Sequence, residues 1–168
     1  MSDSNLKLYR ALGWVNVMRA ACWSVLLVGA SVWADDDHGH AKQRGAAPVN
    51  PVYQRECAAC HMAYPPGLLP AASWRALTAD LPHHFGSDAS LDAPTVNQLT
   101  QWLVKYADSG PRAPQDRITR MPWFVHEHDE VAASVWRRPS IKTAGNCVAC
   151  HRGAEQGQFN EHDIRIPR

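Results

Sequence analysis

Two short cysteine–histidine motifs are the part of this 168-residue sequence with the clearest chemistry. The first, C-A-A-C-H, occupies positions 57–61, and the second, C-V-A-C-H, occupies positions 147–151. This pattern is typical of c-type haem attachment, because the two thiols add to the haem vinyl groups and the adjacent histidine binds the iron. The sequence therefore predicts two covalently attached haem c groups. Their expected anchors are Cys57, Cys60, Cys147 and Cys150, and their expected proximal iron ligands are His61 and His151.

Three other uses of paired cysteines fit the sequence less well. Zinc sites built from two C-x-x-C pairs keep the pairs close, whereas 85 residues (62–146) separate these two. A thioredoxin-like redox pair is expected beside a βαβ pattern, which we do not find. Two structural disulfides would explain neither histidine. We therefore favour haem over zinc, redox pairs and disulfides.

Residues 1–34 have the pattern of an export signal. Three basic residues precede an apolar run at 20–32, and V-W-A at 32–34 is an acceptable cleavage site. The apolar run is short for a membrane span. We expect cleavage and a periplasmic protein without stable membrane insertion, with an uncleaved anchor as the alternative. Export agrees with haem chemistry, because haem thioethers form outside the cytoplasm in bacteria.

The remaining residues, 35–168, are nearly neutral in charge. The leader holds three of the 17 basic and one of the 16 acidic residues, so no nucleic-acid footprint is expected. Residues 35–52 are polar and aperiodic and are expected to be a flexible arm. We expect a first haem lobe at 53–114, similar to class I cytochrome c, and a second haem lobe at 115–168.

The expected fold class is mostly α, with a small, loop-rich C-terminal lobe and no confident strands. Helices are expected at about 71–80, 93–107 and 122–136. Asp92 is an N-cap for the second helix, and a proline follows in its first turn. The proline-rich stretch 62–70 is expected to be an irregular loop, because proline disrupts a helix interior.

The second ligand of the first haem is expected to be His84 or His83. On a helix that extends far enough, His84 shares an apolar face with Trp74, Leu77 and Leu81. A proline at position 82 disfavours helical geometry at the residue before it. Even so, a turn ending in H-F-G at 84–86 would present a histidine beside apolar side chains. We favour His84.

The second ligand of the other haem has two main candidates. His128 shares a helical face with Phe124, Val131 and Val135. His162 is the rival, because in an extended tail it points the same way as Ile164 and Ile166. His126 lies beside acidic residues and is expected to face solvent. We favour His128, and a methionine ligand is less favoured at either iron.

Several stretches match a known family. The most specific is C-H-M-A-Y-P-P-G-L-L-P at 60–70. The others are S-W at 73–74, H-F-G at 84–86, P-W-F at 122–124, E-H at 127–128, Asn146 with the second motif, and I-R-I-P at 164–167. On these residues the chain resembles the dihaem cytochrome c proteins of bacterial periplasms.

The resemblance implies a class I-like cytochrome c lobe followed by a smaller haem lobe, with two bis-histidine haems. It implies His61 with His84 on one iron, and His151 with His128 on the other. Such proteins are often associated with a membrane b-type cytochrome and a small oxygen-binding c-type cytochrome. Redox proteins are therefore the expected partners.

We expect an electron-transfer protein that passes single electrons between redox partners, and not an enzyme. Two protein ligands leave an iron no open position, and bis-imidazole ligation avoids the methionine that raises the reduction potential. The alternatives are a peroxidase-like dihaem enzyme and a haem-based ligand sensor. Both need one open iron, and the histidines suffice to close two.

Overall fold

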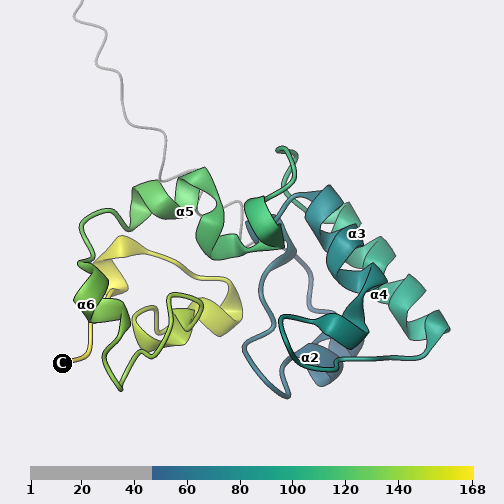
Figure 1. Cartoon of the computed structure of the whole chain (residues 1–168), viewed down its shortest axis with the longest axis horizontal. Coiled ribbons are helices and arrows are strands. Elements are labelled where there is room, and N and C mark those ends of the chain that lie inside the picture. Colours follow the sequence, from purple (N-terminus) through teal and green to yellow (C-terminus); the bar gives the residue numbers. More distant parts are fainter. Residues whose placement is uncertain (1–46) are drawn as a thin grey trace, which may run out of the picture. The chain divides into compact units, whose positions relative to one another are not determined.

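A computed structural model of the chain describes residues 47–168, which are helical with irregular connections and contain no strand. Within these residues no helix combines the length and apolar character that a bilayer crossing requires. The helices are α2 (Pro51–Cys57), α3 (Ala71–Ala79), α4 (Ala93–Lys105), α5 (Pro122–Glu127) and α6 (Ala133–Trp136) (Figure 1). Short 3-10 turns lie at η1 (Pro66–Leu68), η2 (Leu81–His83), η3 (Pro114–Asp116), η4 (Ile118–Arg120), η5 (Cys147–Ala149), η6 (Ala154–Gln156) and η7 (Glu161–Asp163). The mostly helical class is thus confirmed here, while the expected export signal and residues 35–46 of the expected arm lie outside the described residues.

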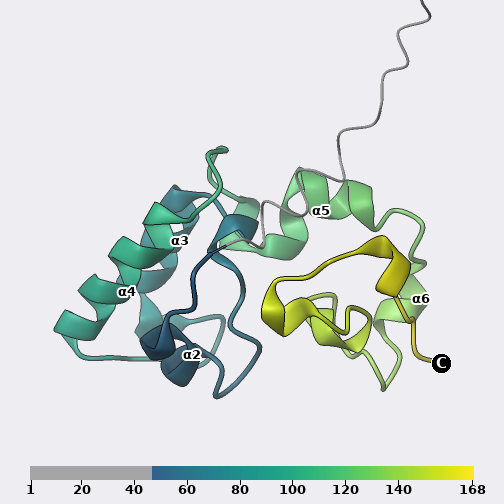
Figure 2. The same cartoon turned by 180° about the vertical axis from the view of Figure 1, so that it is seen from behind.

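Helices α3 and α4 lie side by side, as both views of the ribbon show (Figures 1 and 2). The sequence predicted both. Asp92 caps α4 as expected, accepting a hydrogen bond from the Thr95 backbone N–H at 3.0 Å. Leu99 and Leu103 on α4 are buried, and they belong to the same core cluster as Trp74 on α3. This pair therefore forms part of an apolar core.

Sequence analysis missed helix α2, which leads directly into the first cysteine motif. The side chain of Asn50 accepts hydrogen bonds from the backbone N–H groups of Val52 and Tyr53, at 3.0 and 3.1 Å. Proline at the first helical position has a backbone angle already suited to a helix. The helix takes up Pro51 and Val52 from the end of the expected arm. The signal was present as N-P at 50–51, but the helix is too short to show a clear apolar period.

The proline-rich loop at 62–70 is irregular, as expected, and most of it is buried. The indole N–H of Trp74 donates to the Pro66 carbonyl at 2.7 Å, which ties the loop to α3. Leu69 is only 2 % exposed. The loop therefore fills the space between the first motif and α3.

The helix expected over residues 122–136 is wrong, because the chain breaks into α5 and α6. His128 leaves helical geometry at φ −125°, ψ 17°. Its ring Nδ1 bonds to the Phe124 carbonyl at 2.8 Å, the acceptor that its backbone N–H would use in a continuing helix. The side chain thus competes with the backbone for the helical partner. Val131 and Val135 are therefore not on one helix with His128.

The segment from 137 to 168 consists of loops and 3-10 turns, and it folds back on itself. The backbone N–H of Arg165 donates to the Cys150 carbonyl at 3.0 Å. The guanidinium of Arg138 donates to the Pro167 carbonyl at 2.8 Å. Of the buried apolar side chains in the described residues, this segment supplies Ile141 and Ala154. It therefore has little apolar core of its own.

Candidate functional site

The structure pairs the histidine of the first motif with the favoured distal candidate. The rings of His61 and His84 face each other with centroids 6.2 Å apart and an interplanar angle of 26°. Nδ1 of His61 lies 2.6 Å from the Met62 carbonyl oxygen. Because a carbonyl can only accept, Nδ1 carries the proton, and Nε2 keeps a free lone pair for a metal.

A tight turn, and not a helix, presents His84. Helix α3 ends at Ala79, so the shared helical face that sequence analysis considered does not extend to position 84. The chain turns at Phe85 and Gly86, which have φ values of 52° and 96°. The alternative, His83, is exposed and bonds to the Asp80 carboxylate at 2.7 Å. The preference for His84 over His83 thus agrees with the geometry, although the helical argument for it was wrong.

The second motif has a matching pair. The ring centroids of His128 and His151 lie 6.1 Å apart, at an interplanar angle of 73°. The contact of His128 Nδ1 with the Phe124 carbonyl again requires the proton on Nδ1, which directs Nε2 to a metal. Phe124 also stacks on the His128 ring, with centroids 4.1 Å apart and planes 17° apart. The break in the helix at His128 therefore fixes both the tautomer and the orientation of this ring.

The rival candidates for this position lie elsewhere. His162 is exposed and sits inside η7, so the tail is not extended there as the sequence argument required. Ile164 and Ile166 from the same tail instead line the cavity beside the second motif. His126 is exposed, as expected. The tail therefore contributes apolar cover at this site.

The spacing of the two histidine pairs fits a metal ion between them. An imidazole nitrogen binds a transition metal at about 2 Å. Two rings that hold one ion from opposite sides therefore have centroids roughly 6 Å apart. Both pairs have this separation. Each pair is thus spaced for two axial ligands of one iron.

One histidine of each pair, His84 or His151, has a lowered pKa and a ring nitrogen without a hydrogen-bond partner. Nδ1 of His84 and Nδ1 of His151 are buried and have no hydrogen-bond partner in the protein. Burial lowers the pKa of His84, and repulsion from His61 lowers it further. The pKa of His151 is lowered in the same way, by burial and then by His128. Neutral imidazole is the form that binds a metal.

A largely apolar cavity of about 310 Å³ lies beside the second motif. Both motif cysteines and both histidines of the pair line it, together with hydrophobic side chains. One wall is Leu68, which comes from the loop after the first motif. Thiols, imidazoles and apolar walls on one cavity are the groups that a covalently attached haem requires, so these residues fit the cofactor.

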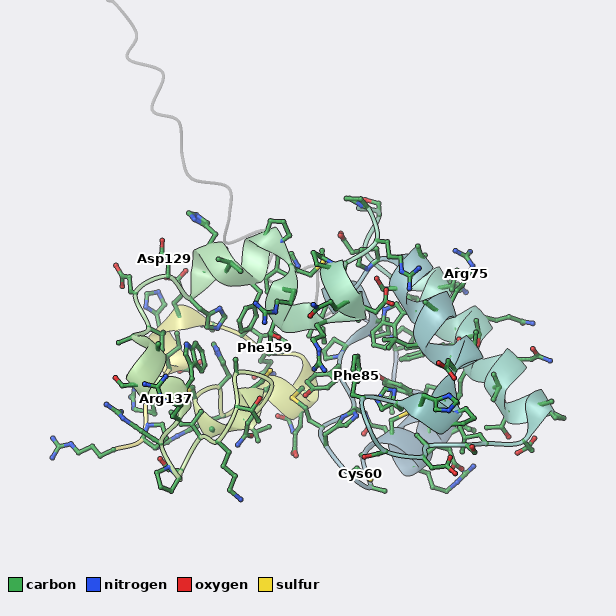
Figure 3. The ribbon with its side chains drawn as sticks, viewed as in Figure 1. Cys60, Arg75, Phe85, Asp129, Arg137 and Phe159 are labelled. Carbon is green, nitrogen blue, oxygen red and sulfur yellow. The ribbon has the colours of Figure 1, made fainter. Side chains whose placement is uncertain are left out.

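Three of the four motif cysteines, Cys57, Cys147 and Cys150, are partly shielded from solvent. Burial raises the pKa of the Cys57 thiol to about 11, and burial also raises that of Cys147 to about 11. Cys60 is exposed and projects outward beyond α2 (Figure 3). None of the four cysteines forms a disulfide, so all four are available for haem attachment.

Aromatic side chains surround the four rings, and sequence analysis assigned no role to them. Tyr64 stacks on His61 at 4.8 Å, Phe85 meets His84 at 4.9 Å, and Phe159 meets His151 at 5.5 Å. Phe85 is nevertheless 46 % exposed, whereas Phe159 is half-buried; both are labelled in Figure 3. Tyr64 and Phe85 lie within three positions of His61 and His84 in the sequence, whereas Phe159 lies eight positions after His151.

Comparison with known proteins places the chain in a family. A family model described as dihaem cytochrome c matches residues 53–159. The crystal structure of a dihaem c-type cytochrome from Shewanella baltica OS155 is 39% identical, with a TM-score of 0.65, over 72% of this chain and 95% of that one. A structure of the dihaem cytochrome from Rhodobacter sphaeroides is 47% identical, with a TM-score of 0.60, over 68% of this chain and 100% of that one.

A comparison with curated protein sequences found no match. The family model nevertheless spans both cysteine motifs and all four paired histidines. The predicted pair of haem groups is therefore confirmed, with Cys57 and Cys60 on one and Cys147 and Cys150 on the other. The chain belongs to the dihaem cytochrome c family, and it is a c-type cytochrome that carries two haems.

Proposed function

We propose that this cytochrome carries single electrons between redox proteins and that both of its irons are closed by two histidines. His61 and His84 hold the first iron, and His151 and His128 hold the second. Each haem iron, when bound, takes up and releases one electron. The protein residues orient the four imidazoles and cover the cofactors with apolar side chains.

The observation that carries this proposal is the spacing of the two histidine pairs. Separations of 6.2 and 6.1 Å leave room for one metal ion between the two imidazoles of each pair, which supports the proposal. A peroxidase-like enzyme or a ligand sensor needs one side free for its substrate or ligand. Two occupied sides favour an outer-sphere electron carrier over either alternative.

We further propose two haem lobes, at 53–114 and 115–168. The first, like a class I cytochrome c, has an apolar core built on α3 and α4. The second is organised around its cofactor, because residues 137–168 bury few apolar side chains. The haem supplies the packing surface that this segment lacks.

The proposed setting is the bacterial periplasm. The signal-like pattern of residues 1–34 and the chemistry of thioether formation both support export. The family resemblance suggests a membrane b-type cytochrome and a small c-type cytochrome as partners. Isolation of the protein from a periplasmic fraction, with the mass of residues 35–168 plus two haems, is the expected result. A haem-free or membrane-retained product contradicts this setting.

Carbon monoxide tests the closed irons. The dithionite-reduced protein should not bind carbon monoxide, because histidine occupies both sides of each iron. The oxidised protein should also lack the long-wavelength charge-transfer band that marks a methionine ligand. Binding at one haem would favour the enzyme or sensor alternatives, and the charge-transfer band would overturn the bis-histidine assignment.

A further inference from the structure

Tyr64 connects the two haem sites through a short series of contacts. Its ring stacks on His61, with centroids 4.8 Å apart and planes 27° apart. Its hydroxyl donates a hydrogen bond of 2.7 Å to the carbonyl of Gly145, which is 81 positions away in the sequence. The sulfur of Cys147 lies 3.6 Å from the same carbonyl oxygen. One residue thus reaches from a candidate ligand of the first iron to an anchor of the second haem.

The surrounding residues hold this bridge in place. The hydroxyl of the buried Tyr53 donates a hydrogen bond of 2.8 Å to the Tyr64 carbonyl, which helps to position the Tyr64 backbone. On the other side, a Cβ at position 145 would lie only 3.3 Å from the Tyr64 hydroxyl oxygen. Glycine therefore permits the close approach of the phenol to the second motif.

We propose that Tyr64 is the positioning residue for electron exchange between the two haems, through its ring on His61 and its hydroxyl bond to Gly145. The proposal rests on the proposed function, because it takes His61 as a ligand of the first iron. Electrons tunnel more readily through covalent and hydrogen bonds than across gaps of the same length. The hydroxyl bond closes the gap between the loop of the first motif and the loop that precedes the second.

The electron balance needs no further reactant. One electron leaves the reduced haem of one motif, whose iron goes from the ferrous to the ferric state. The same electron arrives at the oxidised haem of the other motif, whose iron becomes ferrous. Tyr64 keeps its electrons and its proton throughout. A tyrosine hydroxyl ordinarily has a pKa of about 10, so it remains a hydrogen-bond donor at neutral pH.

The test compares two tyrosines that each lose one hydroxyl. Tyr64→Phe keeps the ring on His61 and removes the bond to Gly145. Tyr53→Phe removes a neighbouring bond that does not reach the second motif. In half-reduced holoprotein, proton NMR exchange of the haem methyl resonances gives the rate of intramolecular electron exchange, which is independent of protein concentration. We expect Tyr64→Phe to slow this exchange several-fold, and Tyr53→Phe, which keeps the bond to Gly145, to slow it clearly less.

A second variant perturbs the bond between the Tyr64 hydroxyl and the Gly145 carbonyl at its acceptor residue. Gly145→Ala adds a methyl group against the Tyr64 hydroxyl and should also slow the exchange, while the visible spectra of both haems stay low-spin. An unchanged rate in Tyr64→Phe overturns the bridge, as does equal slowing in Tyr53→Phe, which would indicate general loosening of the loop. Either result leaves the proposed electron carrier standing. That function fails separately, if the wild-type protein binds carbon monoxide.

Discussion

The four candidate iron ligands differ in how their rings are turned. His61 and His84 are nearly parallel, at 26°, whereas His128 and His151 are nearly perpendicular, at 73°. An imidazole donates π density to the iron d orbital that matches its plane. Two parallel rings donate to the same one of the two iron dπ orbitals, so the energies of these orbitals differ. Two perpendicular rings donate to one dπ orbital each, so the two energies stay nearly equal. The two irons are therefore expected to differ electronically, although both have two histidines.

Electron paramagnetic resonance of the oxidised protein should separate the two haems. We expect two low-spin signals of equal intensity, one rhombic with resolved g-values and one dominated by a single strongly shifted low-field feature. His128→Ala should remove the low-field feature and leave the rhombic signal. Two superimposable rhombic signals would show that the difference in ring orientation is not retained with haem bound.

The distal assignments can be tested with neighbouring histidines as controls. His128→Ala should make one haem of the two high-spin and able to bind carbon monoxide, because it vacates one axial position. His126→Ala and His162→Ala should keep the wild-type spectrum, since both side chains are exposed. Carbon monoxide binding to His162→Ala, but not to His128→Ala, would place the ligand in the tail.

The distal ligand of the first haem can be tested with a matched pair of variants. His84→Ala should open one iron to carbon monoxide, whereas His83→Ala should lose only an exposed contact with Asp80. Optical titration of the reduced proteins measures both. Carbon monoxide binding to His83→Ala, with His84→Ala unchanged, would reverse the assignment within this turn.

At the scale of elements, the sequence predicted the helices that follow ordinary rules. An N-cap and an apolar period located α4, and the end of α3 agreed with expectation to one residue. The helix prediction failed where a side chain takes a carbonyl that a backbone N–H would otherwise use. The ring of His128 takes the carbonyl that would continue α5, and no propensity or period carries that information. The same residue was still identified as a ligand candidate, because histidine chemistry and apolar neighbours are visible without the helix.

The cap of α2 should contribute measurably to stability, since this helix leads into the first motif. Asn50→Ala leaves the Val52 and Tyr53 N–H groups without their side-chain acceptor. We expect a loss of about 1 kcal/mol in the free energy of unfolding. Denaturant unfolding of the holoprotein, followed by circular dichroism, measures the change. Asn50→Asp keeps an acceptor and should be close to wild type; an equal loss in both variants would argue against a capping role.

At the scale of the whole molecule, apolar burial is unevenly distributed. The core cluster gathers side chains from α2, α3, α4 and α5, whereas residues 137–168 depend on backbone hydrogen bonds and a few buried side chains. Sequence analysis anticipated this contrast only as a small, loop-rich C-terminal lobe. It could not anticipate that Leu68, from the loop after the first motif, also lines the second cavity.

Removal of the second haem should therefore unfold one segment selectively. In a Cys147→Ser, Cys150→Ser double variant, we expect residues 137–168 to lose hydrogen-exchange protection, because they lack a core without the cofactor. Helices α3 and α4 should stay protected. Mass spectrometry of deuterium uptake measures both regions in one experiment. A uniform loss of protection, or none, would contradict the uneven distribution of burial.

The buried thiols have a consequence for the order of biosynthesis. The thiolate is the reactive form of cysteine, and the folded surroundings of Cys57 raise its pKa to about 11. A chain that folds first therefore holds this thiol in its least reactive state. Alkylation of the haem-free chain should accordingly be faster at Cys57 in denaturant than in native buffer, and equal rates would contradict this. Haem attachment at Cys57 is therefore expected to precede folding of the chain around this thiol.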